Sequence, residues 1–126
     1  MKLQFPEGFI WGTSTAAYQI ETASENNWKG LKCKDGTTFD KCSQHDLHRD
    51  EDLEYICQIS NGYRMSHDWG KLQKAPFAEF DQKEVDAYLR FMEELKRRGK
   101  HIMLVLHHFT NPLWFEAEGS WEKEGN

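Results

Sequence analysis

The architecture of this chain is set by residues 5–21, which read FPEGFIWGTSTAAYQIE. Apolar residues lead into a block of small ones, residues 12–17, and the stretch ends on two hydrogen-bonding side chains, Gln19 and Glu21. Small residues let a backbone pass close to its neighbours or to a ligand, while Gln and Glu supply donors and acceptors. We interpret residues 9–17 as a short strand that runs into a loop, and the two hydrogen-bonding side chains behind it as one edge of a polar site.

Two helices and two further strands are predicted after this stretch. Residues 22–44 are polar and contain turn-forming residues, so they predict a long loop. A helix is predicted in HRDEDLEYICQISNG, residues 48–62, with the acidic residues 50–52 in its first turn. Its apolar positions are Leu53, Ile56 and then Ile59 or Ser60. Residues 62–69, GYRMSHDW, alternate well enough to predict a short strand.

The second helix has the clearer pattern. Asp81 is expected to cap its start, with Glu84 as the capping-box partner, and Gly99 is expected to end it. Its apolar stripe consists of Val85, Tyr88, Leu89, Met92 and Leu95. The apolar run IMLVL, residues 102–106, follows at once and predicts a strand that is buried on both faces of a parallel sheet.

This order of elements predicts an α/β fold with right-handed crossovers. Polar and aromatic side chains come where the predicted strands end. They are Gln19 after the first strand, Trp69 after the second, and His107, His108 and Phe109 after the third. Since α/β barrels build their sites from the C-terminal ends of their strands, we expect these side chains to share one site.

Composition and charge narrow the class of protein. The 126 residues suffice for one domain, and an aromatic content of 13% suits stacking against sugar rings as well as packing. The net charge of −5 argues against a nucleic-acid partner. The sequence shows no apolar run long enough for a membrane span and no segment typical of a secretory signal. Three cysteines fit a reducing compartment, so a cytoplasmic protein without nucleic-acid or membrane partners is predicted.

Two histidines and two carboxylates are candidates for chemistry at the strand ends. His107 and His108 either close a buried strand, with one ring bonded to backbone, or offer an imidazole to a substrate hydroxyl beside Gln19. Glu21 and Asp68 are the carboxylates expected near the site, and Glu21 fits a buried hydrogen-bond acceptor equally well. The sequence contains no Gly-rich phosphate loop or dinucleotide fingerprint, so no cofactor is predicted.

Four side chains raise the question of a zinc site. Cys33, Cys42, His45 and His48 are residue types that bind zinc well. Their spacing, C-x8-C-x2-H-x2-H, differs from that of a usual zinc knuckle, and the two histidines begin a helix rather than end one. Solvated histidines and reduced cysteines are the preferred interpretation, and a small zinc-stabilised domain is the alternative.

Five segments in order give the chain a resemblance to glycoside hydrolase family 1, the β-glucosidase family. Residues 5–21 resemble the family's N-terminal signature, and HRDEDL, residues 48–53, resembles its His-Arg-x-x-Glu-Asp helix start. GYRMSHDW, residues 62–69, is similar to the second barrel strand, usually Tyr-Arg-Phe-Ser-x-x-Trp. LHHFTNPLWF, residues 106–115, resembles the third-strand segment, and residues 118–126 the Gly-Gly-Trp turn that follows it.

The resemblance implies a partial TIM (β/α)8 barrel, with the first three strands and the intervening helices, and retaining hydrolysis of β-glycosides. The implied roles are sugar binding for Gln19, His108 and Phe109, support of the catalytic nucleophile for Arg64, and lining or support of the pocket for Trp114 and Trp121. Phe109 stands where the family often has Trp, and Gly70-Lys71 where it usually has Ser-Arg. These departures leave the sugar preference open.

The chain is expected to hold only part of that enzyme. A full barrel takes about 250 residues, and the family's two catalytic Glu motifs, Asn-Glu-Pro and Glu-Asn-Gly, do not occur here. We therefore expect residues 1–126 to be an incomplete N-terminal segment of one glycosidase domain, without a catalytic residue, metal site or cofactor. Its expected partners are a β-glycoside or oligosaccharide substrate and the remaining barrel segment, in the same or another chain. The alternative is a non-catalytic carbohydrate-binding or assembly module.

Overall fold

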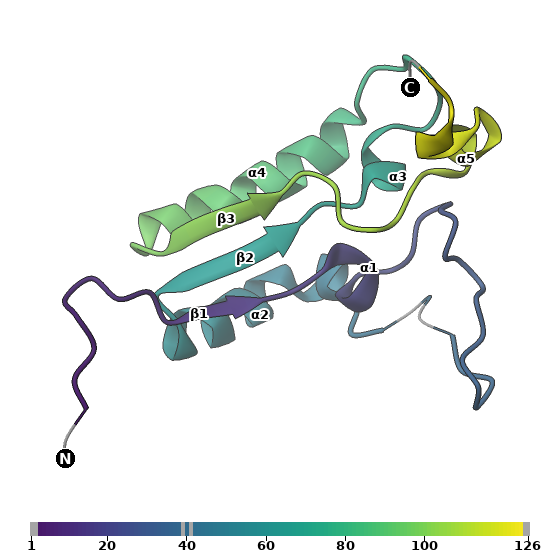
Figure 1. Cartoon of the computed structure of the whole chain (residues 1–126). Coiled ribbons are helices and arrows are strands. Elements are labelled where there is room, and N and C mark those ends of the chain that lie inside the picture. The colour runs from purple at the N-terminus through teal and green to yellow at the C-terminus, as the bar shows by residue number, and fades with distance from the viewer. Residues whose placement is uncertain (1–2, 39, 41, 125–126) are drawn as a thin grey trace.

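Three parallel strands form the sheet of this protein, whose computed structural model describes residues 3–38, 40 and 42–124. The strands are β1 (Gly12–Ser14), β2 (Gly62–Ser66) and β3 (His101–Val105), in the order β1-β2-β3. The helices are α1 (Ala17–Ile20), α2 (His45–Ile59), α3 (Trp69–Leu72), α4 (Gln82–Arg97), α5 (Leu113–Ala117) and the 3-10 helix η1 (Ser120–Glu122). Figure 1 shows α2 and α4 behind the sheet, and α1, α3 and α5 beyond the strand ends.

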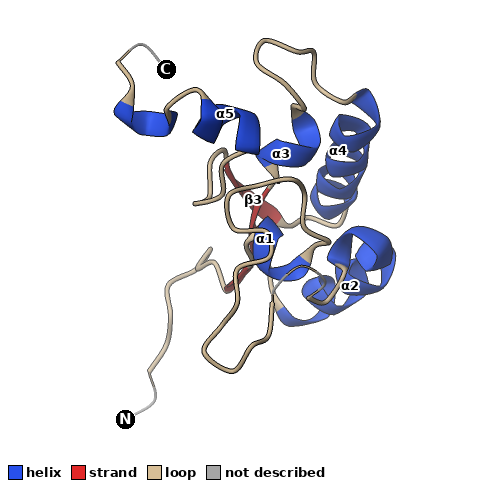
Figure 2. Cartoon of the chain, turned by 90° about the vertical axis from the view of Figure 1, so that its right-hand side faces the viewer, coloured by secondary structure: helices blue, strands red, loops and turns tan. Residues whose placement is uncertain are grey.

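The parallel register brings the C-terminal ends of the three strands together. Ser14 pairs with Arg64, and Arg64 pairs with Met103. Viewed from the right-hand side of Figure 1, the short helices α1, α3 and α5 lie around these ends, as Figure 2 shows. The predicted α/β order is confirmed, and this edge of the sheet is where the functional site is sought.

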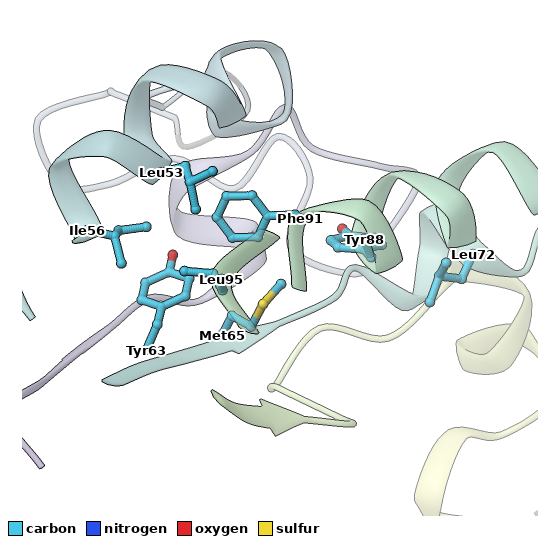
Figure 3. Close-up of a cluster of buried hydrophobic side chains, with 8 residues drawn as sticks. All are labelled: Leu53, Ile56, Tyr63, Met65, Leu72, Tyr88, Phe91 and Leu95. Atoms are coloured by element: carbon cyan, nitrogen blue, oxygen red, sulfur yellow. The ribbon is translucent and has the colours of Figure 1, made fainter. Parts of the chain in front are cut away.

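The apolar core lies between the sheet and helices α2 and α4 (Figure 3). Its buried members are Leu53, Ile56, Tyr63, Met65, Leu72, Tyr88, Phe91 and Leu95. Side chains alternate across a strand, so Tyr63 and Met65 face the helices, whereas Arg64 and Ser66 belong to the opposite face. Burying a large apolar side chain contributes roughly 1.5–3 kcal/mol relative to leaving it exposed. This burial holds the two long helices on one face of the sheet and leaves the other face, which carries Arg64 and Ser66, without a long helix.

Helix α2 begins one turn before the predicted start. It starts at His45, its first-turn acid is Asp46, and His48 interrupts the helical backbone with φ −121° and ψ 23°. The acidic residues 50–52 therefore follow the kink and do not lie in the first turn. The extra turn is held by a hydrogen bond of 2.6 Å between His45 Nδ1 and the carboxylate of Asp52, a contact that the apolar spacing does not reveal.

The start of α4 confirms its cap but not the capping box. The Asp81 carboxylate accepts hydrogen bonds from the backbone N–H groups of Lys83 at 3.1 Å and Glu84 at 3.4 Å. In a capping box the Glu84 side chain would accept the N–H of Asp81. That N–H instead donates to the Leu72 carbonyl at 2.7 Å, which ties the helix start to the end of α3.

The end of α4 is a Schellman motif. Gly99 has a φ of 71°, its N–H donates to the Lys96 carbonyl at 2.9 Å, and the Lys100 N–H donates to the Leu95 carbonyl at 3.0 Å. A positive φ suits glycine, which lacks a Cβ. Gly99 therefore ends the helix as predicted and turns the chain into β3.

One apolar position of α4 faces solvent against expectation: Leu89 is exposed, and Phe91, which the predicted stripe omitted, is buried in the core. Of the two alternatives for the last position of the α2 stripe, Ser60 is buried and Ile59 is exposed. In both helices, the buried face depends on where the sheet and the other long helix pack, and not on the spacing of apolar residues alone.

Strand β3 is more exposed than its apolar run predicted. Met103 is 63% exposed and Leu106, just past the strand, is 73% exposed. Helix α4 covers one face, where Ile102 packs against the core, and within the described residues β3 is an edge strand. The prediction of burial on both faces is therefore wrong for this chain, because the described residues provide a cover for only one face.

The second strand is shorter than predicted, since β2 ends at Ser66 rather than at residue 69. β1 covers residues 12–14 of the stretch 9–17, where a short strand running into a loop was predicted. The short helices α1 and α3, which the sequence did not predict, follow these strands after two residues each, and Asp68 caps α3 by accepting the Gly70 N–H at 2.9 Å. The expected loop over residues 22–44 is confirmed in its described part, and residues 39 and 41 lie outside the described residues. None of the described helices has the length and apolar character that a membrane span requires.

Replacing Asp81 by Ala tests the cap of α4. We expect Asp81→Ala to lower the free energy of unfolding by about 1 kcal/mol, because two N–H groups of the first turn lose their acceptor. Chemical denaturation of the 126-residue chain measures this difference. Lys83→Ala is the matched control, since its side chain is exposed and its change leaves the cap intact. Equal stability of the two variants would contradict the capping role.

Candidate functional site

The site lies at the C-terminal edge of the sheet, where each strand delivers a polar or aromatic group. Gln19 comes from α1 after β1, Ser66 from the end of β2, and His108 and Phe109 from the segment after β3. Arg64 stands one pleat below Ser66 on the same face of β2. The chain order therefore places every sequence-predicted sugar-binding position at one end of the sheet.

Ser66 joins the three strand ends. Its side-chain oxygen receives the backbone N–H of Ala17, the first residue of α1, at 2.9 Å. The same oxygen lies 3.3 Å from Nδ1 of His108. Ser66 is buried, with 3% of its surface exposed, so these contacts form away from bulk water.

His108 is held in its neutral form at ordinary pH. Burial, the nearby charge of Arg64 and the neighbouring His107 all lower the pKa of the His108 imidazole below its ordinary value of 6.5. A neutral imidazole has one donor and one acceptor nitrogen. Such a group suits a hydroxyl ligand better than a charged one.

His107 turns away from this arrangement. Its Nε2 lies 2.8 Å from the side-chain oxygen of Asn111, and its ring is 5.0 Å from that of Trp121. The two histidines of the sequence pair therefore have different roles: His107 belongs to the loop packing, and His108 belongs to the candidate site. Both rings contact side-chain oxygens, whereas the sequence interpretation of a closed strand predicted that one ring bonds to backbone.

The Gln19 side chain makes no hydrogen bond to the described part of the chain. It lies on α1 and is exposed, and the Gln19 N–H donates to the Ala16 carbonyl at 2.9 Å. Ala16 and Ala17 are buried. The turn beneath Gln19 is thus fixed by backbone contacts while its amide faces outward.

Arg64 anchors the open face of the sheet. Its Nη1 donates to the hydroxyl of Ser14 at 3.0 Å. It also lines a hollow of about 420 Å³ over the strands, whose other lining residues include Ile10, Ser14, His101 and Met103. The guanidinium is therefore positioned between β1 and β2 with space in front of it.

Phe109 sits in a strained turn against an aromatic pair. Its φ of 53° lies in the left-handed region, which is unusual for a bulky residue, and the Thr110 N–H donates to the His108 carbonyl at 2.8 Å across it. The Phe109 ring is 5.2 Å from that of Trp28 and 6.2 Å from that of Tyr18. Backbone strain of this kind concentrates at binding sites.

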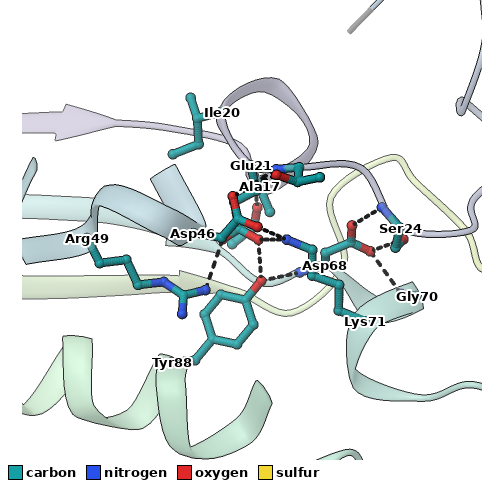
Figure 4. A network of polar contacts seen from close by, with 12 residues as sticks. Ala17, Ile20, Glu21, Ser24, Asp46, Arg49, Asp68, Gly70, Lys71 and Tyr88 are labelled. Atoms are coloured by element: carbon teal, nitrogen blue, oxygen red, sulfur yellow. Dashed lines mark hydrogen bonds and ion pairs between the residues drawn. The ribbon is translucent and has the colours of Figure 1, made fainter. Parts of the chain in front are cut away.

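The carboxylate of Glu21 is the centre of a buried ion-pair network (Figure 4). Glu21 is 2% exposed and accepts hydrogen bonds from Lys71 Nζ at 2.7 Å and from the Tyr88 hydroxyl at 2.8 Å. Lys71 also donates to Asp46 at 3.2 Å, and Arg49 Nη2 lies 3.7 Å from Glu21. Glu21 is therefore a buried acceptor, as one of the two sequence interpretations had it.

The pKa values in this network follow from burial and pairing. Burial alone would lower the pKa of Lys71, but the charges and hydrogen bonds of Glu21 and Asp46 outweigh it and raise that pKa above 10.5. Burial alone would raise the pKa of Asp46, but the Thr22 N–H and Lys71 outweigh it and lower that pKa below 3.8. Both partners are thus charged at neutral pH.

Asp68 is likewise fully engaged. It accepts the Ser24 hydroxyl at 2.8 Å and the Gly70 N–H at 2.9 Å, and its own N–H donates to the Tyr88 hydroxyl at 3.1 Å. A Cβ on Gly70 would come within 2.4 Å of the Ser24 hydroxyl oxygen. The contact between Ser24 and Asp68 therefore requires glycine at position 70. Glu21 and Asp68, the two carboxylates expected near the site, both serve the internal network.

Three of the five tryptophans, Trp69, Trp114 and Trp121, form a cluster beside the site. The Trp69 ring lies 5.4 Å from that of Trp114 and 6.3 Å from that of Trp121. Trp114 Nε1 donates to the Gln73 carbonyl at 2.9 Å, and Trp121 Nε1 to the Asn111 side-chain oxygen at 3.3 Å. These contacts give the cluster a role in holding the segment after β3.

The alternative of a zinc site concerns Cys33, Cys42, His45 and His48. No group of three or more His, Cys, Asp or Glu side chains in the described part of the chain is arranged to hold a metal ion. His45 bonds to Asp52, and His48 is exposed. Nothing in these contacts supports a zinc-stabilised domain.

Three contributors were missed from the sequence. Ser66 stands two residues after Arg64, and the period of two along a strand could have placed it on the same face. Tyr18 and Trp28 carried no comparable signal. Trp28 comes from the long loop, and it meets Phe109 because Asn27 of that loop bonds to Asn111 beyond β3.

The amino-acid sequence is similar to those of known glycosidases. The sequence model of glycosyl hydrolase family 1 matches residues 1–125. β-Glucosidase A of Acetivibrio thermocellus is 31% identical over 133 aligned residues, which cover 96% of this chain and 30% of that protein.

Solved structures agree in fold. A β-glycosidase from Pyrococcus horikoshii matches with a TM-score of 0.82 at 32% identity, over 95% of this chain and 29% of that one. A β-glucosidase from Thermotoga maritima in complex with deoxynojirimycin matches with a TM-score of 0.85 at 30% identity, over 93% of this chain and 30% of that one. The chain thus spans about 30% of the length of these relatives, and the expected partial TIM barrel is confirmed.

Removal of the Lys71 ammonium tests the buried network. We expect Lys71→Met to lower the free energy of unfolding by about 3–5 kcal/mol, because the buried Glu21 then loses the one cation that is hydrogen-bonded to it among the described residues. Adding Glu21→Gln to this variant removes the stranded charge and is expected to recover part of the loss. Lys83→Met, at an exposed position, is the control. Denaturant titrations that place Lys71→Met level with Lys83→Met would overturn this assignment.

Acidification probes Asp46. Because its pKa is lowered in the folded state, its charge stabilises the fold above the ordinary value of 3.8 and this contribution is lost as the pH falls through the lower folded value. The stability gap between the wild-type chain and Asp46→Asn is therefore expected to shrink on acidification. Asp50→Asn, at an exposed position, is the control. A gap that does not change with pH would contradict the pairing of Asp46.

Proposed function

The chain belongs to glycosyl hydrolase family 1, and from that membership we propose that it forms part of a retaining β-glycosidase that hydrolyses β-glucosides or related β-glycosides. In this proposal the chain supplies part of the sugar-binding subsite and neither of the two catalytic carboxylates. Residues 1–126 are then an incomplete segment of one glycosidase domain, and its partners are the sugar substrate and the rest of the barrel.

The observation that carries the proposal is the convergence at Ser66. One hydroxyl contacts both the start of α1, which bears Gln19, and the imidazole of His108. A side-chain amide and a neutral imidazole together offer donors and acceptors without net charge. Such a pair can form hydrogen bonds with neighbouring hydroxyls of a sugar ring, and Phe109 supplies an aromatic surface close to it.

The remaining chemistry has to come from elsewhere. A retaining glycosidase needs two carboxyl groups about 5–5.5 Å apart, one as acid/base and one as nucleophile. The two carboxylates that the sequence predicted near the strand ends, Glu21 and Asp68, are bonded to Lys71 and to Ser24. Arg64, with space in front of its guanidinium, suits the neighbourhood of an incoming nucleophile carboxylate.

The unpaired edges of the sheet and the apolar side chains beside them favour the proposal that a further segment of the barrel packs here. Both β1 and β3 are edges in the described sheet, and unpaired parallel edges are hazards that proteins normally cover. Met103 and Leu106 expose apolar surface beside β3, and Ile10 does so beside β1. Further strands of a barrel would pair with these edges and bury that surface.

A complementation experiment tests the proposal. The matched N-terminal part of the Thermotoga maritima β-glucosidase is replaced by this chain, and hydrolysis of an aryl β-glucoside is measured. We expect the chimera to turn over substrate and the isolated 126-residue chain to show none, since it lacks the carboxylate pair. Turnover by the rigorously purified chain alone would overturn the proposed division of roles. A folded but inactive chimera would favour the non-catalytic module.

Substitutions in the same chimera test the subsite. We expect Gln19→Ala and His108→Ala each to lower kcat/KM by about 5- to 150-fold, the loss that accompanies a missing hydrogen bond of about 1–3 kcal/mol to a bound hydroxyl. Gln58→Ala and His48→Ala, both at exposed positions of α2, are the matched controls and are expected to leave kcat/KM unchanged. Equal losses in controls and test variants would remove the support for this site.

A further inference from the structure

Ser66 has the contacts of a positioning residue. Its hydroxyl oxygen lies between two groups from different strands, the N–H of Ala17 and Nδ1 of His108. The N-cap residue of α1, Ala16, makes no side-chain hydrogen bond. Ser66 therefore takes over the capping of α1 from the neighbouring strand.

The direction of the two hydrogen bonds follows from their chemistry. A backbone N–H can only donate, so the Ser66 oxygen accepts from Ala17 and its own hydrogen remains to be placed. No other hydrogen-bond partner of this hydroxyl occurs among the residues that the structure describes. If Nδ1 of His108 carried a proton and donated to Ser66, the hydroxyl hydrogen would be buried without an acceptor, which is costly.

The arrangement that satisfies every atom has Ser66 donating to Nδ1. The neutral imidazole then carries its proton on Nε2. Within the described chain, Nε2 makes no hydrogen bond, and the His108 ring is half-buried. The nitrogen that remains available is therefore a donor.

We propose that Ser66 is a positioning residue of the sugar subsite, which holds the α1 turn that carries Gln19 and fixes His108 in the tautomer that presents Nε2–H to a sugar hydroxyl oxygen. This inference rests on the proposed function for the identity of the ligand. The tautomer itself rests on the contacts of Ser66 alone. Ser66 acts through His108 and Gln19 and does not need to touch the sugar.

The tautomer of His108 is measured directly by nitrogen NMR of the 15N-labelled 126-residue chain. At about pH 8, well above the ordinary pKa of histidine, the expected spectrum shows a protonated Nε2 and a non-protonated Nδ1. In Ser66→Ala we expect this single tautomer to be lost, with a mixture or a protonated Nδ1 in its place. Ser66→Thr keeps the hydroxyl and is expected to restore the wild-type pattern.

A buried serine elsewhere provides the control. Ser60 is also buried, and its hydroxyl donates to the Ile56 carbonyl at 2.8 Å, away from His108. Ser60→Ala is expected to lower stability without changing the His108 tautomer. A general loss of packing would affect both variants alike, whereas a positioning role affects Ser66→Ala alone.

The wild-type spectrum is decisive even if Ser66→Ala does not fold. A protonated Nδ1, or an averaged imidazole signal without a fixed tautomer, in the wild-type chain overturns the proposal. A tautomer that persists unchanged in folded Ser66→Ala overturns it as well. Titration with methyl β-D-glucoside then addresses the ligand separately: a shift of the Nε2 resonance supports the sugar subsite, and its absence counts against the proposed function while the role of Ser66 in fixing the tautomer stands.

Discussion

The hydrogen-bonded ion pair between Glu21 and Lys71 is the contact on which the polar half of this structure depends. A carboxylate at this depth is tolerated only if it is paired and hydrogen-bonded, and Lys71 and the Tyr88 hydroxyl meet that demand. Lys71 and Tyr88 connect Glu21, the residue after α1, to α3 and α4. Lys71 also donates to Asp46, which brings in α2. Four helices are thereby joined at the end of the sheet where the candidate site lies.

This network and the apolar core stabilise the fold in two different ways. The core packs α2 and α4 against one face of the sheet, and burial of apolar surface there is non-directional. The network is directional, because each charge has a specific partner at a specific distance. Gln19 lies two residues before Glu21, so the pairing of a buried carboxylate also determines where an exposed amide is presented.

In the candidate site, too, single side chains connect elements that are far apart in the sequence. Ser66 connects α1 with His108, and the strained turn at Phe109 sends its ring toward Tyr18 and Trp28. A site built on strand ends and held by neighbouring side chains is better defined than one on free loops. The edges and the open face of the sheet, by contrast, have no cover within the described residues, which agrees with a chain that spans about 30% of its relatives.

Much of this could be predicted from the sequence, because it depends on local patterns. Periodicity indicated the two long helices and the strands, Asp81 and Gly99 marked the ends of α4, and the motifs with their order identified the family. Other features depend on contacts between residues far apart in the chain. The helical turns α1 and α3, the burial of Phe91 rather than Leu89, and the exposure of β3 follow from which elements pack together and which faces stay uncovered. The sequence by itself thus determined the fold class and the residues at the strand ends, whereas only the tertiary structure decided that Glu21 is paired with Lys71 and that Ser66 contacts His108, since a buried polar group takes whichever partner the packing brings within reach.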